Sequence, residues 1–157
     1  MRRNIKLKKT VLALTTAALL TTGIAVPTHD ADAATKKKSV KYKKSSRNVA
    51  SVARSIAANR VYRYGANNSY AVDCSSFAQQ VMRAVGKNVP RTTYAQMRAG
   101  KPVYSPKAGD LVFFNGGSHV GVYIGNGQMV DALNPYEGVR QRSIYYIHGS
   151  ITGFYRY

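Results

Sequence analysis

The chain has 157 residues, of which 24 are Lys or Arg and 6 are Asp or Glu, so its formal net charge is +18. That length suits one small domain, and the presence of a single cysteine, Cys74, excludes an intramolecular disulfide. The charge favours polyanionic partners such as nucleic acid, anionic lipid or the anionic polymers of a bacterial cell wall, but it says nothing about chemistry.

The first 33 residues have the three parts of a cleavable secretory signal. A basic N-terminus leads into an apolar stretch at 11–26, and the triplet Ala31-Asp32-Ala33 forms a small-residue cleavage site. A membrane anchor is the alternative, but the stretch is short for a span and contains four threonines. We expect cleavage that removes five basic and two acidic residues, a mature net charge of +15, and no stable membrane insertion afterwards.

Residues 34–48 are rich in lysine and show no apolar periodicity, which predicts a basic disordered linker. This segment is either a plain solvated linker or a basic tail that binds anionic cell-wall polymers by charge. Residues 49–157 suit one catalytic domain without internal repeats. For an exported protein the wall is a better partner than nucleic acid, so we expect a secreted or wall-associated bacterial protein that binds no nucleic acid.

The apolar pattern changes at Asn48, which is a candidate N-cap for a helix that runs to Ala57. A second helix is predicted from about Ser75 to Val85, and Gly86 is its expected stop. Helices come first and hairpin-linked strands follow, which predicts an α+β fold with N-terminal helices packed on a small antiparallel sheet. The remaining predicted elements are a short helical turn at 93–97 and strands at 110–114, 119–124, 128–133 and 153–157.

Cys74 stands at the start of the second predicted helix, in Asp73-Cys74-Ser75-Ser76-Phe77. Outside the cytosol, a cysteine without a partner is usually avoided or is used for its chemistry. A thiol attacks as its thiolate, and the unpaired N–H groups of a helix start favour that form and can stabilise an oxyanion. The alternative, a small buried hydrophobe, fits a polar helix start less well. We therefore predict that Cys74 is the nucleophile of a thiol hydrolase.

Two histidines remain after the predicted signal is removed, and His119 is the better candidate for the base. It begins an alternating apolar strand, whereas His148 lies in a peripheral segment. Asp131 lies in an apolar strand, where a carboxylate needs a partner, and as a third group it would fix the imidazole. The two side chains share a sheet face if a three-residue loop, Gly125-Asn126-Gly127, joins their strands. The triad therefore predicts this wider turn over a two-residue Asn126-Gly127 loop.

The histidines, the cysteine and the scattered carboxylates of the mature chain have no recognisable metal-ligand spacing. The sequence also contains no glycine-rich loop of the kind that binds phosphate. We therefore predict that the chemistry uses neither a metal nor a cofactor.

Five sequence blocks occur in a characteristic order between Asn48 and Tyr157. They are Val61–Gly65, Asp73–Phe77, Val89–Thr93, Pro106–Phe114 and His119–Gly125. Each block alone is modest evidence, but together they resemble the NlpC-type family of papain-like cell-wall peptidases.

This resemblance implies a papain-like fold and hydrolysis of peptidoglycan stem peptides, usually at the bond between γ-D-glutamate and the following diamino acid. Cys74 matches the family's nucleophile, His119 its base and Asp131 its polar third position. Tyr62 matches a tyrosine that helps to bind substrate or to stabilise the oxyanion. Without the resemblance, Tyr62 would be one of many packing tyrosines.

Three residues depart from the family's usual pattern. Ala66 stands where a second glycine is frequent, Ser76 replaces the common glycine after Cys-Ser, and Asp131 replaces the more frequent histidine. The wall-binding repeats that many relatives carry are missing, and the basic tail is their expected substitute. The predicted mechanism is acyl transfer through a thioester. Its alternatives are a related N-acetylmuramoyl-L-alanine amidase, which cuts the sugar–peptide junction, and a non-catalytic basic protein that binds the wall.

Overall fold

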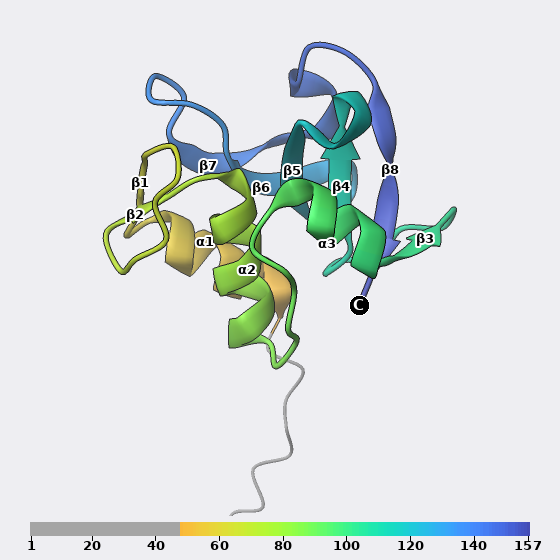
Figure 1. The fold of residues 1–157 in the computed structure, drawn as a ribbon, viewed down its shortest axis with the longest axis horizontal. Coiled ribbons are helices and arrows are strands. Elements are labelled where there is room, and N and C mark those ends of the chain that lie inside the picture. The colour runs from red at the N-terminus through yellow and green to blue at the C-terminus, as the bar shows by residue number, and fades with distance from the viewer. Residues whose placement is uncertain (1–47) are drawn as a thin grey trace, which may run out of the picture. The chain divides into compact units, whose positions relative to one another are not determined.

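The computed structural model of the chain describes residues 48–157. The predicted signal at 1–33 and residues 34–47 of the predicted linker lie outside this range. Figure 1 shows the helices gathered on one side of a sheet, so the predicted α+β class is confirmed. Within the described residues, no helix is both long enough and apolar enough to cross a membrane.

Each α-helix begins after a side chain that caps it. The Asn48 side chain accepts a hydrogen bond from the backbone N–H of Ala50, and Asp73 and Thr92 cap the next two helices in the same way. Such caps satisfy N–H groups that have no partner within the helix. The helices are α1 (Val49–Ala57), α2 (Cys74–Ala84) and α3 (Thr93–Ala99).

Six strands form one antiparallel sheet in the order β3-β8-β4-β5-β6-β7. A separate parallel pair, β1 and β2, lies just before α2 in the chain. The strands are β1 (Val61–Tyr62), β2 (Ala71–Val72), β3 (Lys101–Val103), β4 (Leu111–Phe114), β5 (His119–Gly125), β6 (Gln128–Ala132), β7 (Val139–Ser143) and β8 (Ile151–Arg156); two 3₁₀ turns, η1 (Asn115–Gly117) and η2 (Ile144–Tyr146), follow β4 and β7.

Both faces of the sheet are covered, and β4 is therefore buried along its whole length. Leu111 and Phe113 belong to the main core with α1 and α2, whereas Val112 and Phe114 belong to a second cluster that contains Ile144. A continuous apolar run is the usual pattern of a strand that is covered on both faces. Burial of each such side chain contributes about 1.5–3 kcal/mol to the stability of the fold. The central strands, which carry part of the site, are therefore held in place.

The register of the β5–β6 hairpin is the one that the triad required. Val122 pairs with Val130 in the ladder, and side chains alternate between the two faces along each strand. His119 and Asp131 consequently lie on one face, one diagonal step apart. This register brings the two predicted side chains together.

The tip of this hairpin differs from the predicted three-residue loop. Gly125 pairs with Gln128, so that the loop contains two residues, Asn126 and Gly127, with φ values of 52° and 68°. Positive φ at both positions is typical of a tight hairpin turn. The register shifts between Tyr123 and Gly125, and this bulge takes up the extra residue. The predicted wider turn was therefore wrong, because an irregularity inside the strand provides the same register.

The short strands and the edge strands could not be recognised from their sequence patterns. β7 has the sequence Val-Arg-Gln-Arg-Ser, which has no apolar alternation, and β3 contains Pro102. Both lie at edges of the sheet, where charged residues and proline are frequent because one side of the strand has no partner.

Candidate active site

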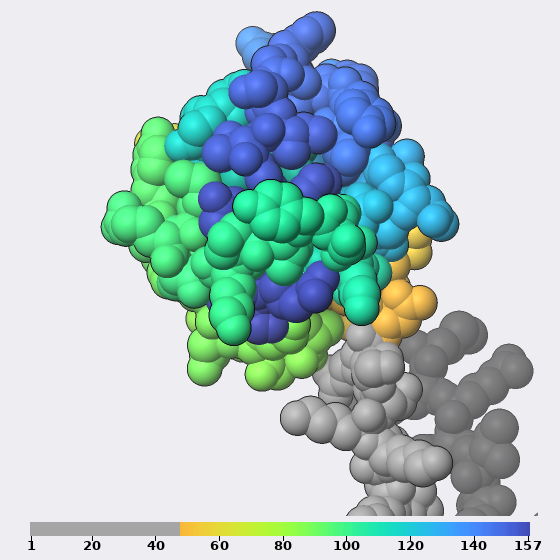
Figure 2. Space-filling view, turned by 90° about the vertical axis from the view of Figure 1, so that its right-hand side faces the viewer, coloured from red at the N-terminus to blue at the C-terminus, as the bar shows by residue number. Residues whose placement is uncertain are grey.

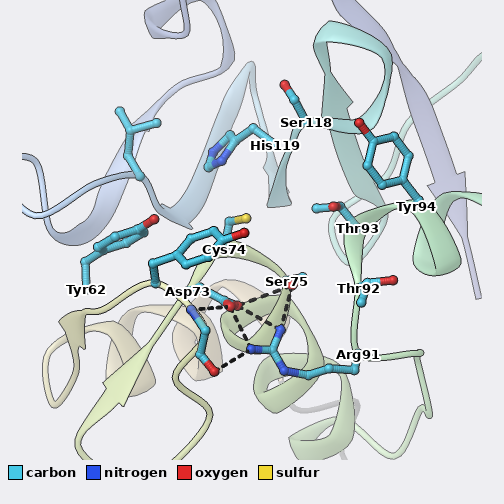
Figure 3. Close-up of a pocket in the computed structure, with 13 residues that line it drawn as sticks. Tyr62, Asp73, Cys74, Ser75, Arg91, Thr92, Thr93, Tyr94, Ser118 and His119 are labelled. Carbon is cyan, nitrogen blue, oxygen red and sulfur yellow. Dashed lines mark hydrogen bonds and ion pairs between the residues drawn. The ribbon is translucent and has the colours of Figure 1, made fainter.

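An open cleft of about 690 Å³ lies where the first turn of α2 meets the start of β5 (Figure 3). Cys74 stands on one wall and His119 on the other, and the two side chains face each other. Tyr62 lies beside them, whereas Asp131 lies behind His119 and outside the cleft. The structure therefore brings all four predicted site residues together. The lining also includes Tyr64, Arg91, Tyr94, Ser118 and Leu133.

Cys74 is the first residue of α2, and Asp73 and Ser76 form a capping box around it. The Asp73 carboxylate accepts a hydrogen bond from the backbone N–H of Ser76 over 2.8 Å, and the Ser76 hydroxyl accepts one from the backbone N–H of Asp73 over 2.9 Å. Other N–H groups of the first turn have no acceptor within the helix. Together with the helix dipole they favour negative charge at the position of the Cys74 sulfur.

Ser76 also links α2 to the preceding loop. Its hydroxyl donates a hydrogen bond to the backbone carbonyl of Ala66 over 2.7 Å. Ala66 and Ser76 are two of the three positions at which the chain departs from the usual pattern of the resembled family, and they are thus in direct contact. The helix start is intact with serine at this position, and the serine adds a link that glycine could not form.

Arg91 fixes the same helix start from the side of α3. Its Nη2 atom is 2.6 Å from Asp73 Oδ2, and its Nη1 atom is 2.8 Å from Ser75 Oγ. Burial by itself would raise the pKa of the Asp73 carboxyl, but hydrogen bonds from Arg91 and Ser76 and the charge of Arg91 hold this pKa below its ordinary value. Asp73 is therefore an ionised cap, and Arg91 ties the loop before α3 to the residues on either side of Cys74.

His119 and Asp131 form a buried pair. His119 Nε2 is 2.7 Å from Asp131 Oδ2, and the exposed fractions of the two residues are 8% and 0%. Because Nε2 is occupied by the carboxylate, Nδ1 is the ring nitrogen that remains for Cys74. This is the arrangement in which a carboxylate fixes the ring of a base that serves a nucleophile.

The pKa of His119 is raised from its ordinary 6.5 to about 9. Burial disfavours the charged ring and would lower this pKa, but hydrogen bonds and charge interactions with Asp131 and Cys74 outweigh burial. The ring is consequently an imidazolium at neutral pH. It can pair with a thiolate and can give a proton to a leaving amine.

Gly121 lies against the side chain of Met129, next to this pair. A Cβ atom at Gly121 would lie 2.6 Å from Met129 Sδ and 3.4 Å from Asp131 Cβ. Real Cβ atoms do not approach a sulfur so closely, and Met129 is fully buried, so it has little freedom to move. Glycine is therefore needed at this position because the buried side chain of Met129 lies against it.

A buried arginine, Arg142 on β7, holds the far side of Asp131. Its Nε donates a hydrogen bond to Asp131 Oδ1 over 2.6 Å, and Nη1 is 3.1 Å from Glu137 Oε2. Glu137 in turn accepts a hydrogen bond from the Tyr146 hydroxyl over 2.9 Å. The carboxylate of Asp131 thus has a partner at each oxygen. Arg142 could not be recognised from the sequence, because nothing in the polar pattern of β7 indicates a buried cation.

Tyr62 reaches the cleft from β1. Burial raises the pKa of its hydroxyl first, and the nearby Cys74 and Asp73 charges raise this pKa further. The hydroxyl therefore keeps its proton and can donate a hydrogen bond. Its position beside the nucleophile suits the predicted role in binding substrate or an oxyanion, which stays a prediction.

A second hollow of about 570 Å³ shares Leu133 with the cleft, and Glu137, Tyr145 and Tyr146 line it.

Within residues 48–157, no three His, Cys, Asp or Glu side chains are grouped as ligands for a metal ion. The arrangement of the cleft suits attack by a thiolate on a carbonyl carbon, with proton transfer by an imidazole.

Comparison with known proteins gives a consistent result. Residues 59–154 match the NlpC/P60 family. The chain is 42% identical over 89 residues to a "Probable endopeptidase" of Corynebacterium glutamicum, a match that covers 55% of this chain and 42% of the relative. It is 46% identical over 77 residues to the "Murein DD-endopeptidase MepS/Murein LD-carboxypeptidase" of Escherichia coli K12, which covers 45% of this chain and 41% of the relative. The matched part thus spans less than half the length of these two relatives.

Solved structures share the fold. The NlpC/p60 domain of the peptidoglycan hydrolase SagA superposes with a TM-score of 0.59 at 27% identity, over 70% of this chain and 96% of that domain. An NlpC/P60 family protein from Bacillus cereus gives a TM-score of 0.56 at 28% identity, over 61% of this chain and 35% of that protein. The sequence match, the fold and the cleft agree, and the chain belongs to the NlpC/P60 family.

Proposed function

We propose that this protein is a cysteine endopeptidase that hydrolyses the stem peptides of peptidoglycan. The observation that carries the proposal is the facing pair of Cys74 and His119, with Asp131 bound to the far nitrogen of the ring. A degenerate, non-catalytic member of the family would have no need to keep all three side chains in this register. The names of the relatives support the same activity.

In the proposed mechanism the Cys74 sulfur attacks the carbonyl carbon of the scissile amide. The C–N bond breaks, and the His119 imidazolium gives its proton to the leaving amine. A thioester joins Cys74 to the acyl part of the substrate. The neutral His119 ring then removes a proton from water, which attacks the thioester; the C–S bond breaks, and the Cys74 thiolate and the His119 imidazolium are restored. Asp131 holds the ring throughout, and the first turn of α2 and Tyr62 stabilise the oxyanion.

The bond that we propose for cleavage lies between γ-D-glutamate and the following diamino acid, as the family resemblance implies. The Escherichia coli relative is named as a DD-endopeptidase and LD-carboxypeptidase, so a test has to distinguish these bonds. Secretion through the predicted signal at 1–33 would bring the enzyme to its substrate. Electrostatic attraction of the basic residues 34–48 to anionic wall polymers would keep it there.

Mass spectrometry of muropeptides from digested peptidoglycan tests the proposal. The purified protein should release fragments that end in γ-D-glutamate, and Cys74→Ala should release none, because the nucleophile has been removed. Cys74→Ser provides the matched control, since it keeps the size and polarity of the side chain and should also lose most activity. Fragments that lack the whole stem peptide would identify an amidase instead. Cleavage of a D,D cross-link would contradict the proposed bond, and unchanged turnover by Cys74→Ala would end the proposal.

A further inference from the structure

Arg142 is a buried cation that takes no part in the mechanism above. Its side chain is 5% exposed, and its Nε lies 2.6 Å from Asp131 Oδ1. We propose that Arg142 is a positioning residue, which holds the Asp131 carboxylate in the orientation that binds His119. The inference rests on the proposed roles of Cys74 and His119 as nucleophile and base.

The geometry leaves Asp131 one orientation. Its Oδ2 binds His119 over 2.7 Å and its Oδ1 binds Arg142 over 2.6 Å, so the carboxylate cannot rotate without losing both bonds. The side chain is completely buried, and a buried carboxylate that lost one of these partners would be costly to keep ionised. Arg142 therefore supplies the second fixed point that a single bond to His119 cannot.

Arg142 is itself held from outside. Its Nη1 is 3.1 Å from Glu137 Oε2, its Nη2 is 3.4 Å from the backbone carbonyl of Glu137, and its guanidinium carbon lies 5.1 Å from the centre of the Tyr146 ring. A planar guanidinium with contacts at all three nitrogens has a fixed direction. The order that Arg142 gives to Asp131 thus comes from the loop between β6 and β7 and from η2.

Charge balance gives Arg142 a second effect on the site. When Cys74 is a thiolate and His119 an imidazolium, Asp131 and Arg142 cancel each other. Without Arg142, the same state would carry a net negative charge in a buried place, so it would form only at higher pH. Other charged and titratable groups lie around these four side chains. Near Arg142 and Asp131 they are Arg140, Glu137 and the hydroxyl of Tyr146. Near Cys74 they are Asp73 with Arg91 and the hydroxyl of Tyr62.

Arg140 provides a matched control. It pairs directly with Asp131 in the β6–β7 ladder and belongs to the same strand as Arg142. Its guanidinium, however, binds Glu137 over 2.9 Å and is 56% exposed. Arg140→Met therefore removes the same charge from the same strand and leaves both oxygens of Asp131 with their partners.

The rate at which iodoacetamide alkylates the full chain reports on Cys74 alone, because the chain has no other cysteine. The rate is measured between pH 4 and pH 10 for the wild type, Arg142→Met and Arg140→Met; this range covers the ordinary ionisation of His and Cys. We expect Arg142→Met to lower the rate at pH 7 by about tenfold, the lower end of the range seen when an outer partner that orients a metal-binding histidine is removed, and to move the profile to higher pH. Arg140→Met should stay within about twofold. A wild-type rate and profile in a folded Arg142→Met protein would overturn the proposal.

If Arg142→Met does not fold, a second pair of variants tests whether Arg142 acts through Asp131. In Asp131→Asn, residue 131 carries no charge for Arg142 to hold, and this variant is compared with the double variant Asp131→Asn/Arg142→Met by the same assay. If Arg142 acts mainly by positioning Asp131, its removal from Asp131→Asn should lower the rate by clearly less than the tenfold expected in the wild type, and the loss that remains reports the direct effect of its charge. A further tenfold loss would show that Arg142 acts by another route and would overturn the proposal. Alkylation needs no peptidoglycan, so the result is independent of whether the proposed peptidase activity is found.

Discussion

The proton on His119 sets the upper limit of the pH range in which the proposed mechanism can operate. The ring is held between Cys74 and Asp131, and its pKa is raised from 6.5 to about 9. Stability that comes from this raised pKa is fully present below pH 6.5 and is lost as the pH rises through about 9. The leaving amine needs the same proton, so activity and this part of the stability should disappear together.

We expect kcat/KM for a muropeptide to fall on an alkaline limb near pH 9. In Asp131→Asn this limb should move to lower pH, because the hydrogen bond and the charge that favour the imidazolium are weakened. The measurement is a pH–rate profile of both proteins. An alkaline limb that stays at the same pH in Asp131→Asn would show that Asp131 does not set the protonation of the ring.

Gly121→Ala should disturb the site without replacing any of its functional groups. The new methyl group would overlap Met129 Sδ and press on Asp131 Cβ, and overpacking of this kind costs about 1–3 kcal/mol. We expect a lower free energy of unfolding in urea and a lower kcat. Gly121→Ala with wild-type stability and activity would show that the Met129 side chain can move aside here at no cost.

At the scale of elements, the first turn of α2 depends on Ser76 as much as on Asp73. Ser76→Ala removes the bond that Ser76 Oγ accepts from Asp73 N–H and the bond that it donates to the Ala66 carbonyl. We expect a loss of about 1–2 kcal/mol in the free energy of unfolding, from the cap and from the buried groups left without partners. Ser51→Ala, at an exposed position in α1, is the control and should change little. Equal stability of the two variants would contradict the proposed role of the capping box.

Most of the elements could be predicted from the sequence, since α1, α2 and the central strands have strong apolar periods or runs. Cys74 and His119 could be found because few residues of their type exist in the chain, and Asp131 because a carboxylate is unusual in an apolar strand. Arg142 could not be found. Arginine is rarely buried without a partner, and its partner is known only when the β6–β7 register is known. The bulge near Gly125 was missed for the same reason, because it depends on pairing between strands.

At the scale of the whole molecule, acidic side chains are paired with arginines, whereas most basic side chains have no acidic partner among residues 48–157. Residues 48–157 contain four acidic residues and twelve Lys or Arg, and every one of these acidic side chains forms an ion pair with an arginine. The other eight basic side chains have no acidic partner in this part of the chain. The domain itself, and not only the basic segment before it, therefore presents uncompensated positive charge to a polyanion.

This distribution predicts how binding to an anionic wall polymer responds to salt. Lys101 and Lys107 are exposed, and the double variant Lys101→Gln/Lys107→Gln should reduce the slope of log K against log salt by about two, one for each lost contact. Arg140→Gln is the control and should reduce the slope less, because Glu137 already occupies this guanidinium. Cosedimentation with purified wall at several salt concentrations measures the slope. An equal change per charge in both proteins would mean that net charge alone governs binding.

Cys74 lies half-exposed in an open cleft, and the chain contains no second thiol. An oxidant that reaches the cleft converts a thiolate first to a sulfenic acid, which a neighbouring cysteine could trap as a disulfide. Here no such trap exists within the molecule. Rescue of the oxidised enzyme depends on a thiol from outside, and without one oxidation continues to the sulfinic acid, which is not reversed by thiols. The same solitary cysteine that makes the proposed nucleophile easy to identify thus makes the protein depend on its surroundings for recovery from oxidation.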